Sequence, residues 1–357
     1  MKIGIITIND LNNYGNRLQC YAVQELLTKI GVVPENVYND NLNIKIKVKR
    51  NIRKIAHTIM RKEGQLVFNK RRKLFKKFNK QIKFSKYKVI RGKTNKKIND
   101  YYDFFVVGSD QVWNPQFNTT SDADFLTFTS DNKKIAFSAS FGVGELKNDI
   151  KQEYKEKLDK FRYLSVRENS GKKIIEDLTE RKDVEVLLDP TMMLSSEEWD
   201  KVLKKPIQLK NNTHKKYILN YFLGEIPKEW SEEIERIAKE NECEIINILD
   251  KKSEFYITGP SEFLYLEKNA FLICTDSFHS SVFSIIYNVP FITFNRIDLY
   301  QSMNSRLDTL LSKFDLENRR FKGKITEDLL ECNYEHINGI LEKEKDKTIK
   351  FLNNIFK

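Results

Sequence analysis

The feature that most constrains the fold is the alternation of short apolar runs with amphipathic stretches along the chain. Residues 3–8 form an apolar run, and residues 18–30 repeat apolar side chains at helical spacing before Gly31. Further apolar or β-branched runs lie at residues 104–108, 134–138, 163–166 and 184–188, with helical stretches at 150–161 and 171–178. This alternation predicts a parallel sheet with helices on its faces.

A second series of the same kind follows the polar stretch 204–216, which we interpret as a linker. Strands are predicted at 217–223, 244–249, 270–274 and 290–294, and helices at 231–241 and 280–287. With 357 residues, 40% of them hydrophobic, the chain is long enough for two cores. We therefore expect an α/β protein with two Rossmann-like domains, 1–205 and 206–325, facing a cleft at the carboxyl ends of their strands. The amphipathic tail 326–357 predicts a C-terminal helix.

One segment, residues 41–100, makes the chain basic. It holds 22 Lys or Arg against two acidic residues, whereas the rest of the chain holds 40 basic and 48 acidic residues, within a formal net charge of +12. Apolar residues recur in the segment at helical spacing, at Ile52, Ile55 and Ile59 and again at Leu74, Phe75, Phe78 and Ile82. We expect a pair of basic amphipathic helices, inserted in the first domain between its first and second strands.

Three interpretations of this insertion stay open. Its lysines can simply be solvated on the surface of helices that have no binding role. They can instead attract an anionic membrane surface or an anionic substrate, at about 1 kcal/mol per basic residue close to a charged surface. Nucleic acid is the third and is not favoured, because the aromatic residues fall on the apolar face and leave no stacking platform.

The expected cellular compartment rests on features that are not seen in the sequence. No apolar run approaches the roughly 18 residues that span a bilayer, and no cleavable secretory leader is seen. Four cysteines, Cys20, Cys243, Cys274 and Cys332, are far apart, so neither a disulfide framework nor a metal site is indicated. We expect a cytoplasmic protein without a bound metal.

Polar and aromatic residues follow the predicted strand 104–108. Asp110 comes after a Gly-Ser turn, and Gln111, Trp113 and Asn114 come next. An acid, amides and an indole at a strand end facing a cleft suit the recognition of sugar hydroxyls, with the indole as a stacking face. The alternative is a turn whose Asp caps the next element.

Arg167 and Glu168 end the predicted strand 163–166. A guanidinium at that place can hold a carboxylate or phosphate with two hydrogen bonds. The alternative is an exposed Arg paired with its neighbour Glu168, which would contribute little.

A third candidate, Asp276-Ser277-Phe278-His279, lies between the predicted strand 270–274 and the helix after it. Free amides at the helix start, with the hydroxyls of Ser277, Ser280 and Ser281, form an anion site, and His279 can donate a proton. The alternative is a structural histidine.

Five stretches together resemble the polysaccharide pyruvyl transferase family, in that family's order: Asn13 to Gln19, Asp103 to Asn114, Ser165 to Glu168, Leu188 to Thr191 and Thr275 to Ser280. Asn304-Ser305-Arg306 is similar to a late family motif. The resemblance implies a GT-B-like fold and the transfer of a pyruvyl group from phosphoenolpyruvate to a saccharide of the cell envelope, such as an exopolysaccharide or capsule precursor, as a ketal.

The resemblance also implies roles. The acid is His279, and Asp110 or Glu168 accepts the hydroxyl proton. The residues expected to bind the donor are Arg167, Ser277, Ser280, Arg306 and Arg17. The residues expected to bind the acceptor are Asn16, Gln111, Trp113 and Asn114. No cofactor is expected besides the donor substrate phosphoenolpyruvate. A lipid-linked acceptor would place the enzyme at the inner face of the membrane, held there by residues 41–100.

The sequence departs from the family at one position. Many members carry Arg two residues before the motif's histidine, and here that residue is Ser277. The donor's anionic groups would then need Arg167, Arg306, Arg17 or the helix-start amides. Two alternatives therefore stay open beside the pyruvyl transferase: a GT-B-like glycosyltransferase using a nucleotide sugar, and a non-catalytic scaffold associated with glycans or membranes.

Overall fold

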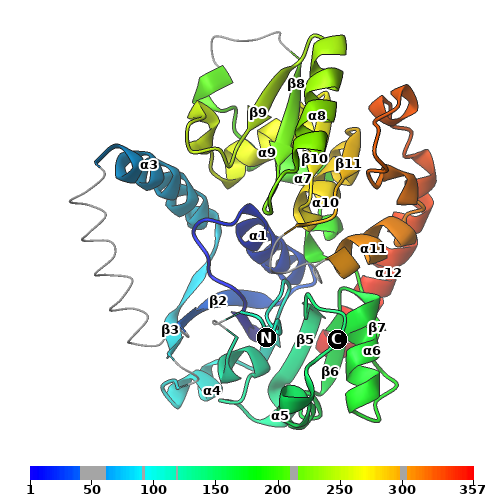
Figure 1. Cartoon of the computed structure of the whole chain (residues 1–357). Coiled ribbons are helices and arrows are strands. Elements are labelled where there is room, and N and C mark those ends of the chain that lie inside the picture. Colours follow the sequence, from blue (N-terminus) through cyan, green and yellow to red (C-terminus); the bar gives the residue numbers. More distant parts are fainter. Residues whose placement is uncertain (41–61, 91–92, 118–119, 210–215, 298–303) are drawn as a thin grey trace. The chain divides into compact units, whose positions relative to one another are not determined.

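A computed structural model describes residues 1–40, 62–90, 93–117, 120–209, 216–297 and 304–357 (Figure 1). Contacts between residues divide the chain into two compact units. Unit 1 comprises Met1–Lys62, Asn79–Met193 and Lys343–Lys357, and unit 2 comprises Glu63–Phe78 and Leu194–Glu342. Both units are therefore discontinuous in sequence.

Unit 1 is built on a seven-stranded sheet in the order β3-β2-β1-β4-β5-β6-β7, with every neighbouring pair parallel (Figure 1). Its strands are β1 (Lys2–Ile6), β2 (Val33–Asp40), β3 (Phe84–Ile90), β4 (Phe104–Val107), β5 (Lys134–Ala139), β6 (Tyr163–Val166) and β7 (Glu185–Val186). The central strands β4 and β5 are almost wholly buried because a parallel sheet is covered on both faces.

The helices of unit 1 are α1 (Tyr14–Lys29), α4 (Lys97–Tyr101), α5 (Asn148–Leu158) and α6 (Asn169–Leu178). Helix α1 begins after Asn13, whose side chain accepts a hydrogen bond from the backbone N–H of Asn16. The chain leaves α1 through Gly31, whose φ of +89° favours glycine. Helix α12 (Glu335–Phe356) starts in unit 2 and ends in unit 1.

Unit 2 has a four-stranded parallel sheet in the order β11-β10-β8-β9. Its strands are β8 (Tyr217–Tyr221), β9 (Glu244–Asn247), β10 (Leu272–Thr275) and β11 (Phe291–Thr293). Its further helices are α3 (Lys62–Phe78, of which Glu63–Phe78 belong to the unit), α7 (Ser196–Asp200), α8 (Lys228–Glu240), α9 (Pro260–Lys268), α10 (Phe278–Tyr287) and α11 (Ser305–Lys313). The predicted α/β class with two Rossmann-like sheets is confirmed, as are the nine predicted strands.

The basic segment differs from its prediction. Its first predicted helix lies in 41–61, outside the described residues. The second is α3, which groups with unit 2 because the buried Arg71 donates to the carbonyl oxygens of Tyr256, at 3.0 Å, and Ile248, at 3.4 Å. The prediction of a purely helical insertion between the first two strands is wrong, because β2 and β3 both lie there. In β3 the lysines alternate with buried residues at the period of a strand, not of a helix.

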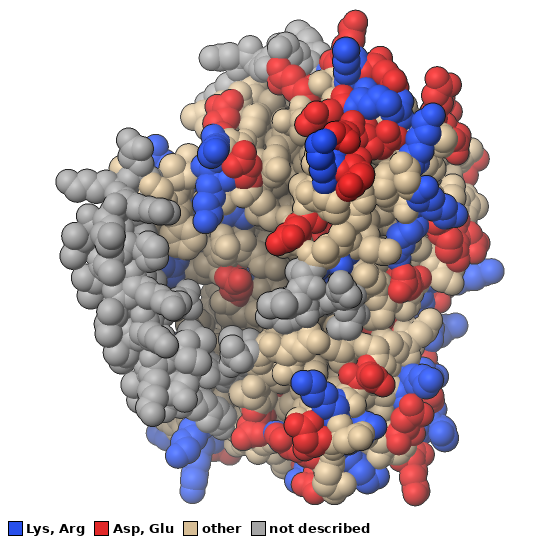
Figure 2. Space-filling model, viewed as in Figure 1, with Lys and Arg blue, Asp and Glu red and all other residues tan. Residues whose placement is uncertain are grey.

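Outside that segment, both signs of charge occur on the surface. On the face shown in Figure 2, acidic and basic side chains are interspersed over the described parts of the molecule. Along α8, for example, Arg236 pairs with both Glu233 and Glu240. Among the described residues, no helix is long and apolar enough to cross a membrane.

Candidate functional site

The candidate residues of unit 1 lie where its parallel strands end. Ser109 and Asp110 follow β4, Arg167 and Glu168 follow β6, and Asp189 follows β7. Because parallel strands end at one edge of a sheet, residues far apart in sequence meet there. All five are at least 97% buried.

The turn after β4 positions Asp110. Gly108 has a φ of +115°, and a Cβ atom at this position would lie 2.2 Å from the carbonyl oxygen of Phe137, so the turn requires glycine. Asp110 itself has a φ of +74°, a conformation that Asp tolerates better than most residues. Its carboxylate accepts a hydrogen bond from its neighbour's backbone, Gln111 N–H, at 2.8 Å and another from the Asn16 side chain.

Arg167 lies between two carboxylates. Its Nη1 donates to Asp189 Oδ2 at 2.6 Å, and its Nη2 donates to Asp110 Oδ1 at 3.3 Å. Burial alone would lower the pKa of Arg167, but the Asp189, Asp110 and Glu168 carboxylates outweigh burial and raise it above the ordinary value. Arg167 is thus bound by carboxylates of its own unit, and its expected role in donor binding stays a prediction.

Glu168 points back into the unit. Its Oε1 accepts hydrogen bonds from the backbone N–H groups of Phe141, at 2.9 Å, and Gly142, at 3.4 Å. Its Oε2 lies 4.0 Å from Arg167 Nε. Glu168 thus fixes the loop after β5. Of the two predicted proton acceptors, Asp110 is the one that accepts a hydrogen bond from α1, through the Asn16 side chain.

Three further predicted residues of unit 1 make hydrogen bonds within the unit. Arg17 Nη2 donates to the Ile8 carbonyl oxygen at 2.7 Å, which holds the loop before α1. Asn114 Nδ2 donates to Gln111 Oε1 at 2.7 Å, and this pair shapes the loop after Asp110. Their expected roles in ligand binding stay predictions.

Trp113 corrects a prediction. Its side chain is fully buried, its Nε1 donates to the Asp124 carbonyl oxygen at 2.8 Å, and Phe125 stacks on it at 5.8 Å between ring centroids. Phe141 and Phe161 pack against it as well. The ring is part of the hydrophobic core, so its faces are not available to stack on a sugar.

In unit 2 the candidate residues surround the start of α10. Ser277 is the N-cap, and the helix has no acidic residue in its first turn, so the helix dipole makes this end positive. Asp276 Oδ1 accepts from Leu223 N–H at 2.7 Å, and its Oδ2 accepts from Gly224 N–H at 2.8 Å. These bonds tie the end of β10 to the end of β8.

Two arginines lie by this helix start. Arg296, which follows β11, donates through Nε to Asp276 Oδ2 at 3.3 Å, and its backbone N–H donates to Asn304 Oδ1 at 3.1 Å. The Arg306 guanidinium lies 5.9 Å from the centre of the Phe278 ring, and that ring is 5.4 Å from the His279 ring. The structure thus places Ser277 and His279 at the helix start with Arg306 over the neighbouring Phe278 ring, and it adds Arg296.

Ser280 corrects a second prediction. It is fully buried, and its hydroxyl donates to Glu267 Oε1 at 2.6 Å, away from an anion at the helix start. Burial raises the pKa of Glu267 well above its usual value. The hydroxyl therefore joins α10 to α9 and is not available to a donor.

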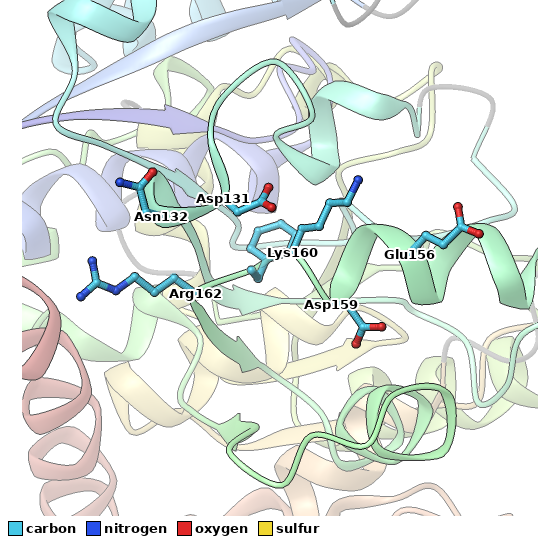
Figure 3. Close-up of a pocket in the computed structure, with 7 residues that line it drawn as sticks. Asp131, Asn132, Glu156, Asp159, Lys160 and Arg162 are labelled. Carbon is cyan, nitrogen blue, oxygen red and sulfur yellow. The ribbon is translucent and has the colours of Figure 1, made fainter.

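A surface pocket of about 650 Å³ lies elsewhere in unit 1 (Figure 3). Its lining comes from the residues just before β5 and β6, with acidic and basic side chains around it. The motif residues follow the opposite, carboxyl ends of these strands, so this pocket is not part of the candidate site. Among the residues that the structure describes, no group of three or more His, Cys, Asp or Glu is arranged to hold a metal ion.

Comparison with known proteins decides the family. The family model described as polysaccharide pyruvyl transferase matches residues 13–298. The chain belongs to the polysaccharide pyruvyl transferase family. The match includes both the Asp110 turn and the start of α10, whereas Arg306 lies beyond it. No curated protein matches the chain.

Solved structures are similar to this pyruvyl transferase family member at low identity. UDP-N-acetylglucosamine 2-epimerase from Rickettsia bellii is 13% identical, with a TM-score of 0.50, 99% of this chain covered and 96% of that chain. The UDP-GlcNAc 2-epimerase from Neisseria meningitidis is 12% identical, with a TM-score of 0.49 and coverages of 98% and 100%. A glycosyltransferase from Rickettsia africae is 11% identical, with a TM-score of 0.43 and coverages of 100% and 99%. Only the first likeness bears on the fold, and the fold is all that it shows.

Sequence reasoning missed partners that belong to other strands. Asp189 was part of a recognised stretch but had no role, and Arg296 was not considered. Asp189 directly follows the predicted strand 184–188, and Arg296 comes two residues after the predicted strand 290–294. That position is the signal that would have found them. Glu267 gave no such signal, because it lies near the end of α9.

Proposed function

We propose that this member of the family transfers a pyruvyl group from phosphoenolpyruvate to two hydroxyls of a saccharide and forms a cyclic ketal. The observation that carries the proposal is the start of α10, where His279 lies in the first helical turn, Arg296 binds the preceding Asp276, and Arg306 lies over the Phe278 ring. A proton donor next to cationic groups is what an anionic enol phosphate needs. In this proposal the donor binds at unit 2.

The two anionic groups of the donor determine what unit 2 has to supply. Phosphoenolpyruvate carries a carboxylate and a phosphate, and guanidinium groups bind both with charge-assisted hydrogen bonds. Arg306 and Arg296 are the cations that we propose for this role, with the N–H groups of the first turn of α10. They would compensate for the family arginine that Ser277 replaces.

His279 is the proposed acid. The unperturbed pKa of histidine, about 6.5, suits proton donation near neutral pH. Protonation of the methylene carbon C3 makes C2 electrophilic, and one acceptor hydroxyl then forms a bond to C2. The bond from C2 to the bridging oxygen breaks, phosphate leaves with that oxygen, and the second hydroxyl closes the ketal.

Asp110 of unit 1 is the proposed acceptor of a hydroxyl proton, with Asn16 beside it to orient the saccharide. The protons balance: the two hydroxyls lose two protons, one of which restores His279 after it has protonated C3, and the other leaves with the phosphate. Arg167 holds the Asp110 carboxylate in place in this proposal and does not bind the donor.

Phosphate release tests the function. The purified protein is incubated with phosphoenolpyruvate and with saccharides that carry two free hydroxyls in ketal-forming positions. The proposal expects phosphate release that requires both substrates. Release of a nucleotide from a nucleotide sugar would instead identify a glycosyltransferase, and turnover with neither donor would favour a non-catalytic scaffold.

We further propose that α3 holds the enzyme at an anionic membrane surface, the inner face of the cytoplasmic membrane, where a lipid-linked acceptor would be found. Arg71, Phe75 and Phe78 are buried on one side of the helix. Lys70, Lys73, Lys76 and Lys77 are exposed, and α3 ends without an acidic residue in its last turns. Basic side chains on an amphipathic helix are attracted to anionic headgroups.

A further inference from the structure

Asp189 connects three of the family stretches in unit 1. Its Oδ2 accepts hydrogen bonds from Arg167 Nη1, at 2.6 Å, and from Ser109 Oγ, at 3.0 Å. Its Oδ1 accepts from the Thr191 backbone N–H, at 3.0 Å, and from Thr191 Oγ1, at 2.7 Å. The carboxylate is thus held by four donors among the described residues, and it is 2% exposed.

We propose that Asp189 is a positioning residue for the transfer reaction: it fixes the Arg167 guanidinium so that Arg167 holds Asp110 in the orientation in which it accepts the acceptor proton. The inference rests on the proposed function, and it assigns a role to the stretch Leu188 to Thr191, which that function did not use.

The distances support this order of action. The bond from Arg167 to Asp189 is short, at 2.6 Å, and the one to Asp110 is long, at 3.3 Å. Asp189 therefore holds the Arg167 guanidinium more firmly than Asp110 does. The weaker bond to Asp110 leaves the Asp110 carboxylate able to take up a proton. Thr191 supplies the rigid support of Asp189, because both of its donors reach the same oxygen.

The charge of Asp189 also helps to balance the charge of Arg167. Arg167 faces Asp110, Glu168 and Asp189, and its side chain is 1% exposed. Without the Asp189 charge, the guanidinium would be drawn fully to Asp110 and Glu168. A tighter pair with Arg167 would make Asp110 a poorer proton acceptor.

A double-mutant cycle in kcat tests the proposal, with Asp189→Asn, Arg167→Gln and the double variant, in the full chain with phosphoenolpyruvate and a saccharide that the wild type converts. We expect Asp189→Asn to lower kcat by at least tenfold while the KM for phosphoenolpyruvate changes less than threefold. In the Arg167→Gln background the same change should alter kcat less than twofold, since a residue that acts through Arg167 has no effect once Arg167 is gone.

Two further variants keep the test decisive. Tyr154→Phe removes another buried hydrogen bond of unit 1, the 3.1 Å bond to the Trp113 carbonyl oxygen, and should leave kcat within twofold. If Asp189→Asn fails to fold, Ser109→Ala removes one donor to Asp189 and should show the same dependence on Arg167 with a smaller loss of kcat.

The outcomes separate the two claims. Additive losses of kcat in the cycle, with an active wild type, would overturn the role of Asp189 and leave the proposed function intact. A wild type without any turnover of phosphoenolpyruvate would overturn the proposed function, and the positioning role would fall with it.

Discussion

The Arg167 guanidinium donates to the Asp189 carboxylate at 2.6 Å, and the side chains of both residues are at most 1% exposed. The two residues are separated by β7 and α6 in sequence and meet because their strands end at the same edge of the unit 1 sheet. Burial of two charged groups costs much desolvation free energy. The pair therefore contributes most to stability when both members are present.

Removal of Arg167 should therefore destabilise the protein. Arg167→Ala leaves Asp110, Glu168 and Asp189 buried without their shared cation, and we expect the free energy of unfolding to fall by about 3–5 kcal/mol. Urea denaturation followed by circular dichroism measures this change. A loss below about 1 kcal/mol would mean that these carboxylates are not dependent on Arg167.

Asp124 should make stability depend on pH. Burial raises its pKa from 3.8 to about 7. A carboxyl group whose pKa is higher in the folded state contributes stability at low pH, and this contribution is lost as the pH rises through about 7. Relative to Asp124→Asn, which cannot ionise, the wild type should lose roughly 2–3 kcal/mol of unfolding free energy between pH 5 and pH 8. Urea denaturation of both proteins at the two pH values measures the difference, and a constant difference would place the pKa near its ordinary value.

His279 should be needed for turnover and not for donor binding. A general acid contributes roughly 100-fold to 10,000-fold, so His279→Ala should lower kcat by at least about 100-fold. Donor affinity, measured by isothermal titration calorimetry, should stay within a few fold. His336, whose Nε2 donates to the Phe314 carbonyl oxygen at 3.0 Å, provides the control: His336→Gln should keep its kcat. Wild-type activity in His279→Ala would make His279 a structural residue.

The lysines of α3 should determine binding to anionic vesicles. At about 1 kcal/mol per lysine, replacement of Lys70, Lys73 and Lys76 by Gln should weaken binding to phosphatidylserine vesicles by about a hundredfold.

The control for the α3 variant removes the same charge elsewhere in unit 2. Lys239, Lys251 and Lys252 are also exposed, and their replacement by Gln should have little effect. Co-sedimentation with vesicles at two salt concentrations measures both variants, and binding should fade as salt increases. Equal losses in the two variants would show that total charge, and not α3, controls the attraction.

Sequence reasoning succeeded where backbone periodicity decides the outcome. The apolar runs located β1, β4 and β10, and the polar residues after them located Asp110 and His279 at strand ends. It failed at β3, because lysines conceal an edge strand whose buried positions are only every second residue.

Side-chain direction could not be predicted in the same way. Trp113 and Ser280 follow strands like their neighbours, yet one packs against Phe125 and the other bonds to Glu267. Those partners lie in other elements, and only the tertiary packing determines which side of the backbone is buried. The link from Arg167 to Asp189 was missed for the same reason.

The central claim is that the pyruvyl carbon skeleton is transferred with loss of phosphate. Phosphoenolpyruvate labelled with ¹⁸O in the bridging position tests it, with mass spectra of the saccharide and of the released phosphate. The proposed reaction should give a saccharide that gains an unlabelled pyruvyl ketal, and phosphate that carries all of the ¹⁸O. A phosphorylated saccharide, or ¹⁸O left on the carbon skeleton, would contradict it.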